Sequence, residues 1–129
     1  MPAEPDQSLL AGAAAGGVFE RAASPAAARA AAQAAGLVLV EADVGAAPAA
    51  RADKRAVLQA LAQAFAFGPA FGHNLDALFD SLAERDADTL LVLRRLPRDA
   101  ASTAILDTLR DVADDYAARG RRFVVLWQR

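Results

Sequence analysis

The chain has 129 residues, enough for one domain with a real core and too few for two comfortable ones. Its formal net charge of −2 does not mark the whole protein as a nucleic-acid binder. It has no cysteine, which excludes disulfides, thiolate metal sites and a cysteine nucleophile. No apolar run approaches the length of a membrane span, and acidic residues stand near the N-terminus where a secretory signal carries positive charge.

The first third of the chain predicts a strand and a helix after an irregular start. Residues 1–15 have no periodicity, and we expect them to be disordered. Residues 17–21 predict a short edge strand. Ser24 and Pro25 suit an N-cap and a first helical position, and Gly36 suits a helix stop, so a helix is expected between them. Its face is nearly all alanine, so it can pack closely against a sheet.

The next segment predicts a strand, a loop and a second helix. Residues 37–40 form a continuous apolar run, which is typical of a strand covered on both faces. A loop over residues 43–52 follows, and Asp53 is the expected N-cap of a helix that stops at Gly68 and Pro69. The predicted apolar stripe of this helix consists of Val57, Leu58, Leu61 and Phe65.

Residues 69–82 predict an aromatic loop followed by a short helix with two different faces. Asn74 stands at the N-cap position, and the helix is expected to end near Arg85. One face is an apolar stripe made by Leu75, Leu78, Phe79 and Leu82. Another face carries the acidic residues Asp76, Asp80 and Glu84. A rigid acidic helix beside an aromatic loop is more typical of a docking surface than of a catalytic centre.

The last third predicts two buried strands, over residues 89–93 and 123–127, separated by a long helix. The helix runs from about residue 100, after Asp99, to a stop at Gly120. Its stripe consists of Ile105, Leu106, Leu109, Val112, Ala113 and Tyr116. Buried strands separated by helices predict an α/β fold with a small parallel sheet, in a single domain over residues 16–129.

Several residues could serve catalysis or metal binding, but their patterns favour structural roles. His73 is the sole histidine, and it has no partner spacing for a metal site, so we expect no metal and no cofactor. Asp76 and Asp80 could be an acid–base pair with His73, but they fit an exposed face better. Neither a phosphate-binding loop nor a nucleophile elbow is present.

A group of three arginines and two large aromatic residues are also expected to have structural roles. The arginines at positions 94, 95 and 98 could bind phosphate, but we expect a solvated strand end that faces the acidic helix. Tyr116 and Trp127 lie on apolar stripes and are expected in the core.

The stretch from residue 69 to residue 82 resembles the signature of the barstar family of ribonuclease inhibitors. The pattern is Pro-x-aromatic-Gly-x-Asn-Leu-Asp-Ala-Leu-aromatic-Asp-x-Leu. The resemblance extends over residues 37–129, because the order and spacing of the expected elements also match. The segment of residues 17–36 is an additional strand and helix, as in longer barstar-related bacterial proteins.

The resemblance implies a protein that is not an enzyme and that binds a small basic bacterial ribonuclease in the cytoplasm of the producing cell. The acidic helix and the loop before it would plug the active-site cleft, with carboxylates in the place of RNA phosphates. Asp80 would enter the phosphate site, and Asp76 would support it. The implied partner-binding residues are Phe71, Gly72, His73, Asn74, Asp76, Asp80, Glu84 and Asp115. The resemblance implies a monomer with no direct contact to nucleic acid or membrane.

Some positions depart from the family pattern. Ala70 and Arg85 stand where aromatic contacts are expected, and His73 stands where the best-known member is acidic. These changes make the face less negative. The alternative interpretation is therefore a barstar-like module that binds a non-ribonuclease toxin or another regulatory partner.

Overall fold

The computed structural model describes residues 9–13, 15–46 and 54–129. Asp53, the expected N-cap of the second helix, lies outside the described residues. The elements in chain order are β1 (Gly17–Glu20), α2 (Pro25–Ala35), β2 (Val38–Asp43), the 3-10 turn η1 (Val44–Ala46), α3 (Lys54–Ala64), α4 (Leu75–Ala83), β3 (Thr89–Arg94), α5 (Ala100–Ala118) and β4 (Phe123–Trp127).

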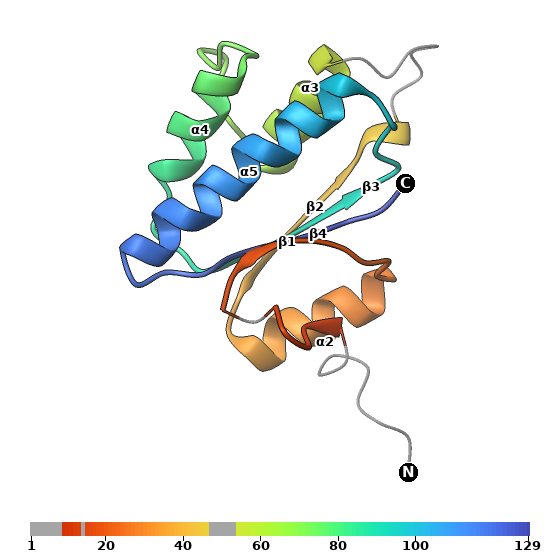
Figure 1. The fold of residues 1–129 in the computed structure, drawn as a ribbon, viewed down its shortest axis with the longest axis vertical. Coiled ribbons are helices and arrows are strands. Elements are labelled where there is room, and N and C mark those ends of the chain that lie inside the picture. Colours follow the sequence, from red (N-terminus) through yellow and green to blue (C-terminus); the bar gives the residue numbers. More distant parts are fainter. Residues whose placement is uncertain (1–8, 14, 47–53) are drawn as a thin grey trace.

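The four strands form one parallel sheet in the order β1-β4-β3-β2. Helices α3, α4 and α5 cover one face, and α2 covers the other (Figure 1). The predicted α/β fold with a small parallel sheet is therefore confirmed, and β1 is an edge strand as expected. No helix within the described part of the chain has the length and apolar character needed to cross a membrane.

The central strands β3 and β4 divide the core into two layers, because successive side chains on a strand point to opposite faces. Leu91 and Leu93 of β3 pack under α3, α4 and α5, whereas Leu90 and Val92 pack toward α2. Phe123 and Val125 of β4 face the first layer, and Val124 and Leu126 face the second. Each of these residues is 0% exposed, which explains why both strands read as continuous apolar runs.

The helix ends largely follow the predicted signals. The side chain of Ser24 accepts a hydrogen bond from the Ala27 N–H, and the Asp99 carboxylate accepts one from the Ser102 N–H. Helix α3 is shorter than expected, because it ends at Ala64 and not at Gly68. The backbone at Ala66 has a φ of 56°, in the left-handed region that terminates helices.

The strand β2 differs from its prediction. A run covered on both faces was expected over residues 37–40, but β2 is the second edge strand and extends from Val38 to Asp43. The side chain of Val38 is 48% exposed. Apolar runs do not distinguish an edge strand from a central one, because burial depends on which strands become neighbours.

Arg94, the last residue of β3, and Arg95 do not face the acidic helix as expected. Parallel neighbours end at the same sheet edge, so Arg94 and Arg95 meet the carboxylates of β2. Arg94 Nη1 lies 2.6 Å from Glu41 Oε2, and Arg95 binds both carboxylate oxygens of Asp43 at 2.7 Å. The hydrogen bonds from Arg95 hold the pKa of Asp43 below its usual value. These arginines thus complete the sheet edge.

The described part of the N-terminal segment, residues 9–13, packs against the sheet on the α2 side. Leu10 is 7% exposed and Ala13 is 0% exposed. The Leu9 carbonyl accepts a hydrogen bond from Arg21 Nη1 at 2.8 Å. Residues 1–8 lie outside the described residues, and the domain boundary near residue 16 stays a prediction.

Candidate functional site

The start of α4 is held by Asn74. Its Oδ1 accepts a hydrogen bond from the Ala77 N–H at 2.7 Å, and its Nδ2 donates to the Gly72 carbonyl at 3.4 Å. Asn74 has extended backbone angles, as an N-cap residue requires. Asp76 lies in the first turn, where a carboxylate stabilises the positive end of the helix. The predicted cap is therefore confirmed, and it fixes the helix to the loop before it.

Helix α4 has the two faces that its sequence predicts. Leu78 and Leu82 are 0% exposed, and Leu75 and Phe79 are partly buried against the same core. The opposite face exposes three carboxylates, which we call the acidic row: Asp76, Asp80 and Glu84. Within the described residues, none of the three has an ion-pair partner. The row is therefore free to meet positive charge from outside.

The loop before α4 is built from a chain of rings. Phe65 and Phe67 stack with ring centres 5.6 Å apart, Phe67 lies 4.9 Å from Phe71, and Phe71 lies 4.9 Å from the ring of His73. Phe71 is only 9% exposed. Its side chain therefore supports the loop from inside, and little of its ring is available as the contact surface that the resemblance implied.

A groove separates this loop from the acidic face of α4. It has a volume of about 370 Å³. Its loop side is lined by Phe67, Gly68, Ala70, Phe71 and Gly72, and its helix side by Ala77, Asp80, Ser81 and Glu84. Two carboxylates thus stand at the edge of a groove with an aromatic wall. Such a groove suits a cationic side chain, since carboxylates attract the charge and aromatic faces accept a cation.

An acid–base role for His73 would require contact with Asp76 or Asp80, but its side chain is bonded to α3 instead. Its Nε2 lies 2.5 Å from Gln59 Oε1 of α3. Its backbone φ is 51°, in the left-handed region. Among the residues the structure describes, no group of three histidine or acidic side chains could hold a metal ion. The histidine joins the loop to α3.

Asp115 lies on α5, near the end of α4. The hydroxyl of its neighbour Tyr116 donates to the Leu82 carbonyl at 2.8 Å. Asp115 forms an ion pair with Arg119 at 3.0 Å, and Arg119 also donates to the Arg85 carbonyl. The structure therefore brings Asp115 beside the last turn of α4, but in an ion pair of its own and outside the groove.

The matched region of a family model covers this whole arrangement. Residues 44–128 match the family Barstar, described as barstar (barnase inhibitor). The chain belongs to the barstar family. No curated protein matches the chain in a sequence search. The match includes the loop, α4, β3, α5 and β4, and it confirms the family that the motif of residues 69–82 indicates.

Within this barstar-family domain, sequence reasoning missed the residues that shape the groove without charge. Phe67 and Ser81 line it, and Gly68 borders it. The aromatic spacing of Phe65, Phe67 and Phe71 was a usable signal, because three rings within seven positions around a Gly-Pro turn indicate a ring-packed loop. Ser81 carried no comparable signal.

Proposed function

We propose that this chain is an intracellular inhibitor of a small basic bacterial ribonuclease. In this proposal α4 and the loop before it enter the active-site cleft of the enzyme and exclude RNA. Members of the family are inhibitors and not enzymes, and the family match supports the inhibitory role. The cytoplasm is the place where such an inhibitor protects its producer, and one inhibitor binds one enzyme.

The observation that carries the proposal is the unpaired acidic row beside the groove. Several carboxylates elsewhere, such as Glu41 and Asp88, are already bound to arginines, so a partner would have to break those bonds, and among the residues that the structure describes the acidic row alone stands beside the groove. Asp80 stands at the groove, exposed and on a short capped helix. A carboxylate held in this way loses little entropy on binding, and opposite surface potentials accelerate encounter.

We assign the roles within the site from these positions together with the family resemblance. Asp80 occupies the place of an RNA phosphate, with Asp76 one turn earlier and Glu84 one turn later. Gly72 leaves room for the cap, because a Cβ at this position would lie 3.1 Å from Asn74 Nδ2 and crowd it. His73 and Asn74 contribute the backbone between loop and helix. Asp115 would add a second acidic contact only if its ion pair with Arg119 opens.

Inhibition assays with a panel of small basic ribonucleases test the proposal. We expect RNA cleavage by at least one enzyme to be blocked at a one-to-one ratio. Asp80→Ala should raise the inhibition constant at least roughly thirtyfold, because a central charged contact is lost. This corresponds to a loss of about 2 kcal/mol of binding free energy. Asp111→Ala is the matched control, since Asp111 is exposed on α5 and has no ion pair among the described residues either.

Unchanged cleavage across the panel would contradict the ribonuclease proposal. If Asp80→Ala and Asp111→Ala lose inhibition equally, the assignment of Asp80 is contradicted. The loss would then reflect the change in net charge and not a contact made by Asp80. A weaker dependence on salt in Asp80→Ala than in the unmodified protein would support direct pairing with a cation.

Arg85 favours a second candidate, a barstar-like module for a partner that is not a ribonuclease. Its guanidinium lies 4.9 Å from the Phe65 ring and donates to Thr89 Oγ1, so a positive charge is fixed directly after the acidic row. A pull-down from native cell extract distinguishes the candidates. Capture of a basic nuclease supports the first, and capture of a different toxin or regulatory protein supports the second.

A further inference from the structure

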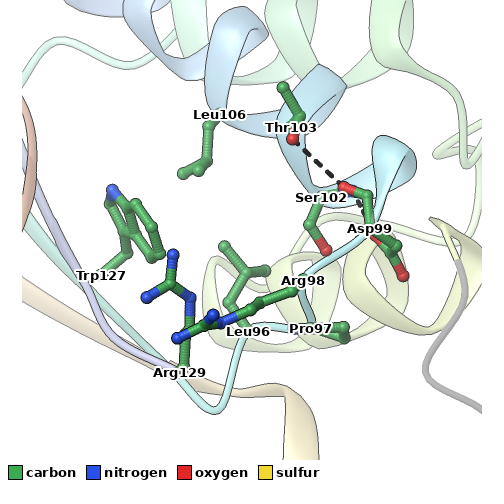
Figure 2. Close-up of a pocket in the computed structure, with 9 residues that line it drawn as sticks. All are labelled: Leu96, Pro97, Arg98, Asp99, Ser102, Thr103, Leu106, Trp127 and Arg129. Carbon is green, nitrogen blue, oxygen red and sulfur yellow. Dashed lines mark hydrogen bonds between the residues drawn. The ribbon is translucent and has the colours of Figure 1, made fainter.

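A second pocket lies where β3 and β4 end and α5 begins. The chain leaves β3 for α5 on one face of the sheet and leaves β1 for α2 on the other, and the pocket lies on the α5 side, between the β3–α5 connection and the end of β4. Open parallel sheets bind ligands at this kind of position, outside the carboxyl ends of the strands where the connections diverge. The pocket has a volume of about 340 Å³. It is lined by Leu96, Pro97, Arg98, Asp99, Ser102, Thr103, Leu106, Trp127 and Arg129 (Figure 2).

The pocket has an apolar side and a cationic side. Leu96, Leu106 and the ring of Trp127 form the apolar side. Trp127 packs against the core as expected, but it is only partly buried, so part of its ring faces the pocket. The guanidinium of Arg129 lies 5.4 Å from the Trp127 ring centre, and Arg98 is exposed with no ion pair among the described residues. A flat apolar group fits beside the indole, and an anionic group fits near the arginines.

Ser102 supplies an independent reason to expect a ligand. It is 2% exposed, and its Oγ has no hydrogen-bond partner. In Figure 2 its hydroxyl points from α5 toward the side of the pocket with Leu96 and Arg98. Buried hydroxyls are normally satisfied, because an unmade hydrogen bond costs stability. A ligand oxygen would satisfy this one, at the positive end of α5.

Two carboxylates lie near the pocket: Asp99 keeps its charge but is turned to the helix end, and Glu20 is paired with Arg129. Asp99 Oδ1 accepts the hydrogen bond from the Ser102 N–H at 2.7 Å and so caps α5. Glu20, at the end of β1, binds Arg129 Nη1 at 2.8 Å, in a pair of which both side chains are more than 40% exposed. Exposed pairs of this kind are weak and can yield to a ligand. Arg98 therefore provides the free cation, and Arg129 the second one.

We propose that this pocket binds a small organic anion with a flat apolar body. The anionic group lies between Arg98, Arg129 and the Ser102 hydroxyl, and the body lies beside Trp127 and Leu106. The pocket shares no lining residue with the groove of α4, so this binding is independent of the proposed inhibition.

Trp127 makes the proposal directly measurable, because it is the one tryptophan of the chain. Its fluorescence is followed while the full chain is titrated with phenyl phosphate, benzoate, phenol or inorganic phosphate. We expect a saturable change with phenyl phosphate or benzoate, with phenol and inorganic phosphate at least roughly tenfold weaker, since each lacks one half of the ligand. The two organic anions distinguish a tetrahedral from a planar head group.

Three variants complete the test. Arg98→Ala should weaken binding roughly tenfold or more, whereas Arg29→Ala, which removes an exposed arginine from α2, should leave it unchanged. Ser102→Ala should also weaken binding. The thermal unfolding midpoint of this variant should equal or exceed that of the unmodified protein, because no hydrogen bond of the Ser102 hydroxyl is lost. No saturable change with either organic anion, or equal binding by Arg98→Ala and Arg29→Ala, would overturn the proposal.

Discussion

At the scale of single residues, the site depends on one backbone turn. His73 has a φ of 51°, and the next residue, Asn74, is extended with a φ of −135°. Histidine and asparagine tolerate such positions better than most residues, and the short asparagine side chain can reach back to the helix. The hydrogen bond between His73 and Gln59 then holds the turn against α3. The direction of α4 is set by these few contacts.

Removing the cap should therefore loosen α4. We expect Asn74→Ala to lower the free energy of unfolding by about 1 kcal/mol, because the Ala77 N–H loses its acceptor. Urea denaturation at neutral pH measures the change. Asn74→Asp is the matched control, since its carboxylate can accept the same hydrogen bond and should keep most of the stability. Equal stability of Asn74→Ala and the unmodified protein would show that the cap contributes nothing.

At the scale of elements, α4 is fastened at its far end by α5. Tyr116 is fully buried, its ring packs 5.0 Å from Phe123, and its hydroxyl donates to the Leu82 carbonyl. Burial raises the pKa of the Tyr116 hydroxyl, although the neighbouring Arg85 and Arg119 oppose the shift. The helix that carries the acidic row is thus held at both ends, by Asn74 and by this hydroxyl.

Loss of the hydroxyl should make α4 more mobile without disturbing the core. We expect Tyr116→Phe to cost about 1 kcal/mol and to speed amide exchange in α4 more than in β3, because the ring packing is retained. Hydrogen exchange measures the difference. Thr108→Ala serves as the control, since its hydroxyl bonds within α5 to the Ala104 carbonyl. Exchange in α4 that is unaffected by Tyr116→Phe would mean that the tether does not hold the helix.

At the scale of the whole molecule, one residue, Asp88, joins β2, β3 and β4 at the edge of the sheet where these strands begin. Asp88 accepts hydrogen bonds from the Arg122 N–H at 3.0 Å and from the Arg122 guanidinium at 3.0 and 3.1 Å. Its own carbonyl accepts from the Val38 N–H, at the start of β2. The hydrogen bond from the Arg122 N–H is the main cause that holds the pKa of Asp88 below its usual 3.8, and the hydrogen bonds from the guanidinium add to it.

This clamp should make the protein sensitive to acid. A lowered pKa in the folded state contributes stability above the unfolded value of 3.8, and that contribution is lost as pH falls through the folded value. The pKa of Asp43 is lowered in the same way by its hydrogen bonds from Arg95, so Asp43 also contributes stability that is lost at acidic pH. Urea denaturation between pH 3 and pH 7 should show stability falling below about pH 4, and a shallower fall in Asp88→Asn. Parallel curves for the two proteins would assign the acid sensitivity to other groups.

Local patterns explain which parts of the fold were predictable from the sequence. The caps Ser24 and Asn74, the start of α5 after Asp99 and the stripes of α4 and α5 depend on neighbours within a few positions, so they were predicted correctly. The partners of Arg94 and Arg95 depend on β2 lying beside β3, which no local spacing encodes. The same holds for Phe71, whose burial requires the other rings of the loop.

The site was predictable in its charges and not in its shape. The acidic row follows from helical spacing and from the motif that carries the family resemblance. The groove needs Phe67 and Phe71 on one side and Ser81 on the other, and only the folded loop brings them together. The pocket over β4 combines residues from the ends of two strands and the start of α5, so it arises from topology alone.

The pairing of β1 with β4 has a consequence for the order in which the protein folds. Gly17 pairs with Val124, and the Ala23 N–H bonds to the side chain of Gln128, 105 positions later. During synthesis β1 leaves the ribosome first, yet its neighbour in the sheet emerges last of the four strands. Contacts so distant in sequence form slowly. The N-terminal strand therefore docks only after translation has passed β4, and until then its edge is open to other chains.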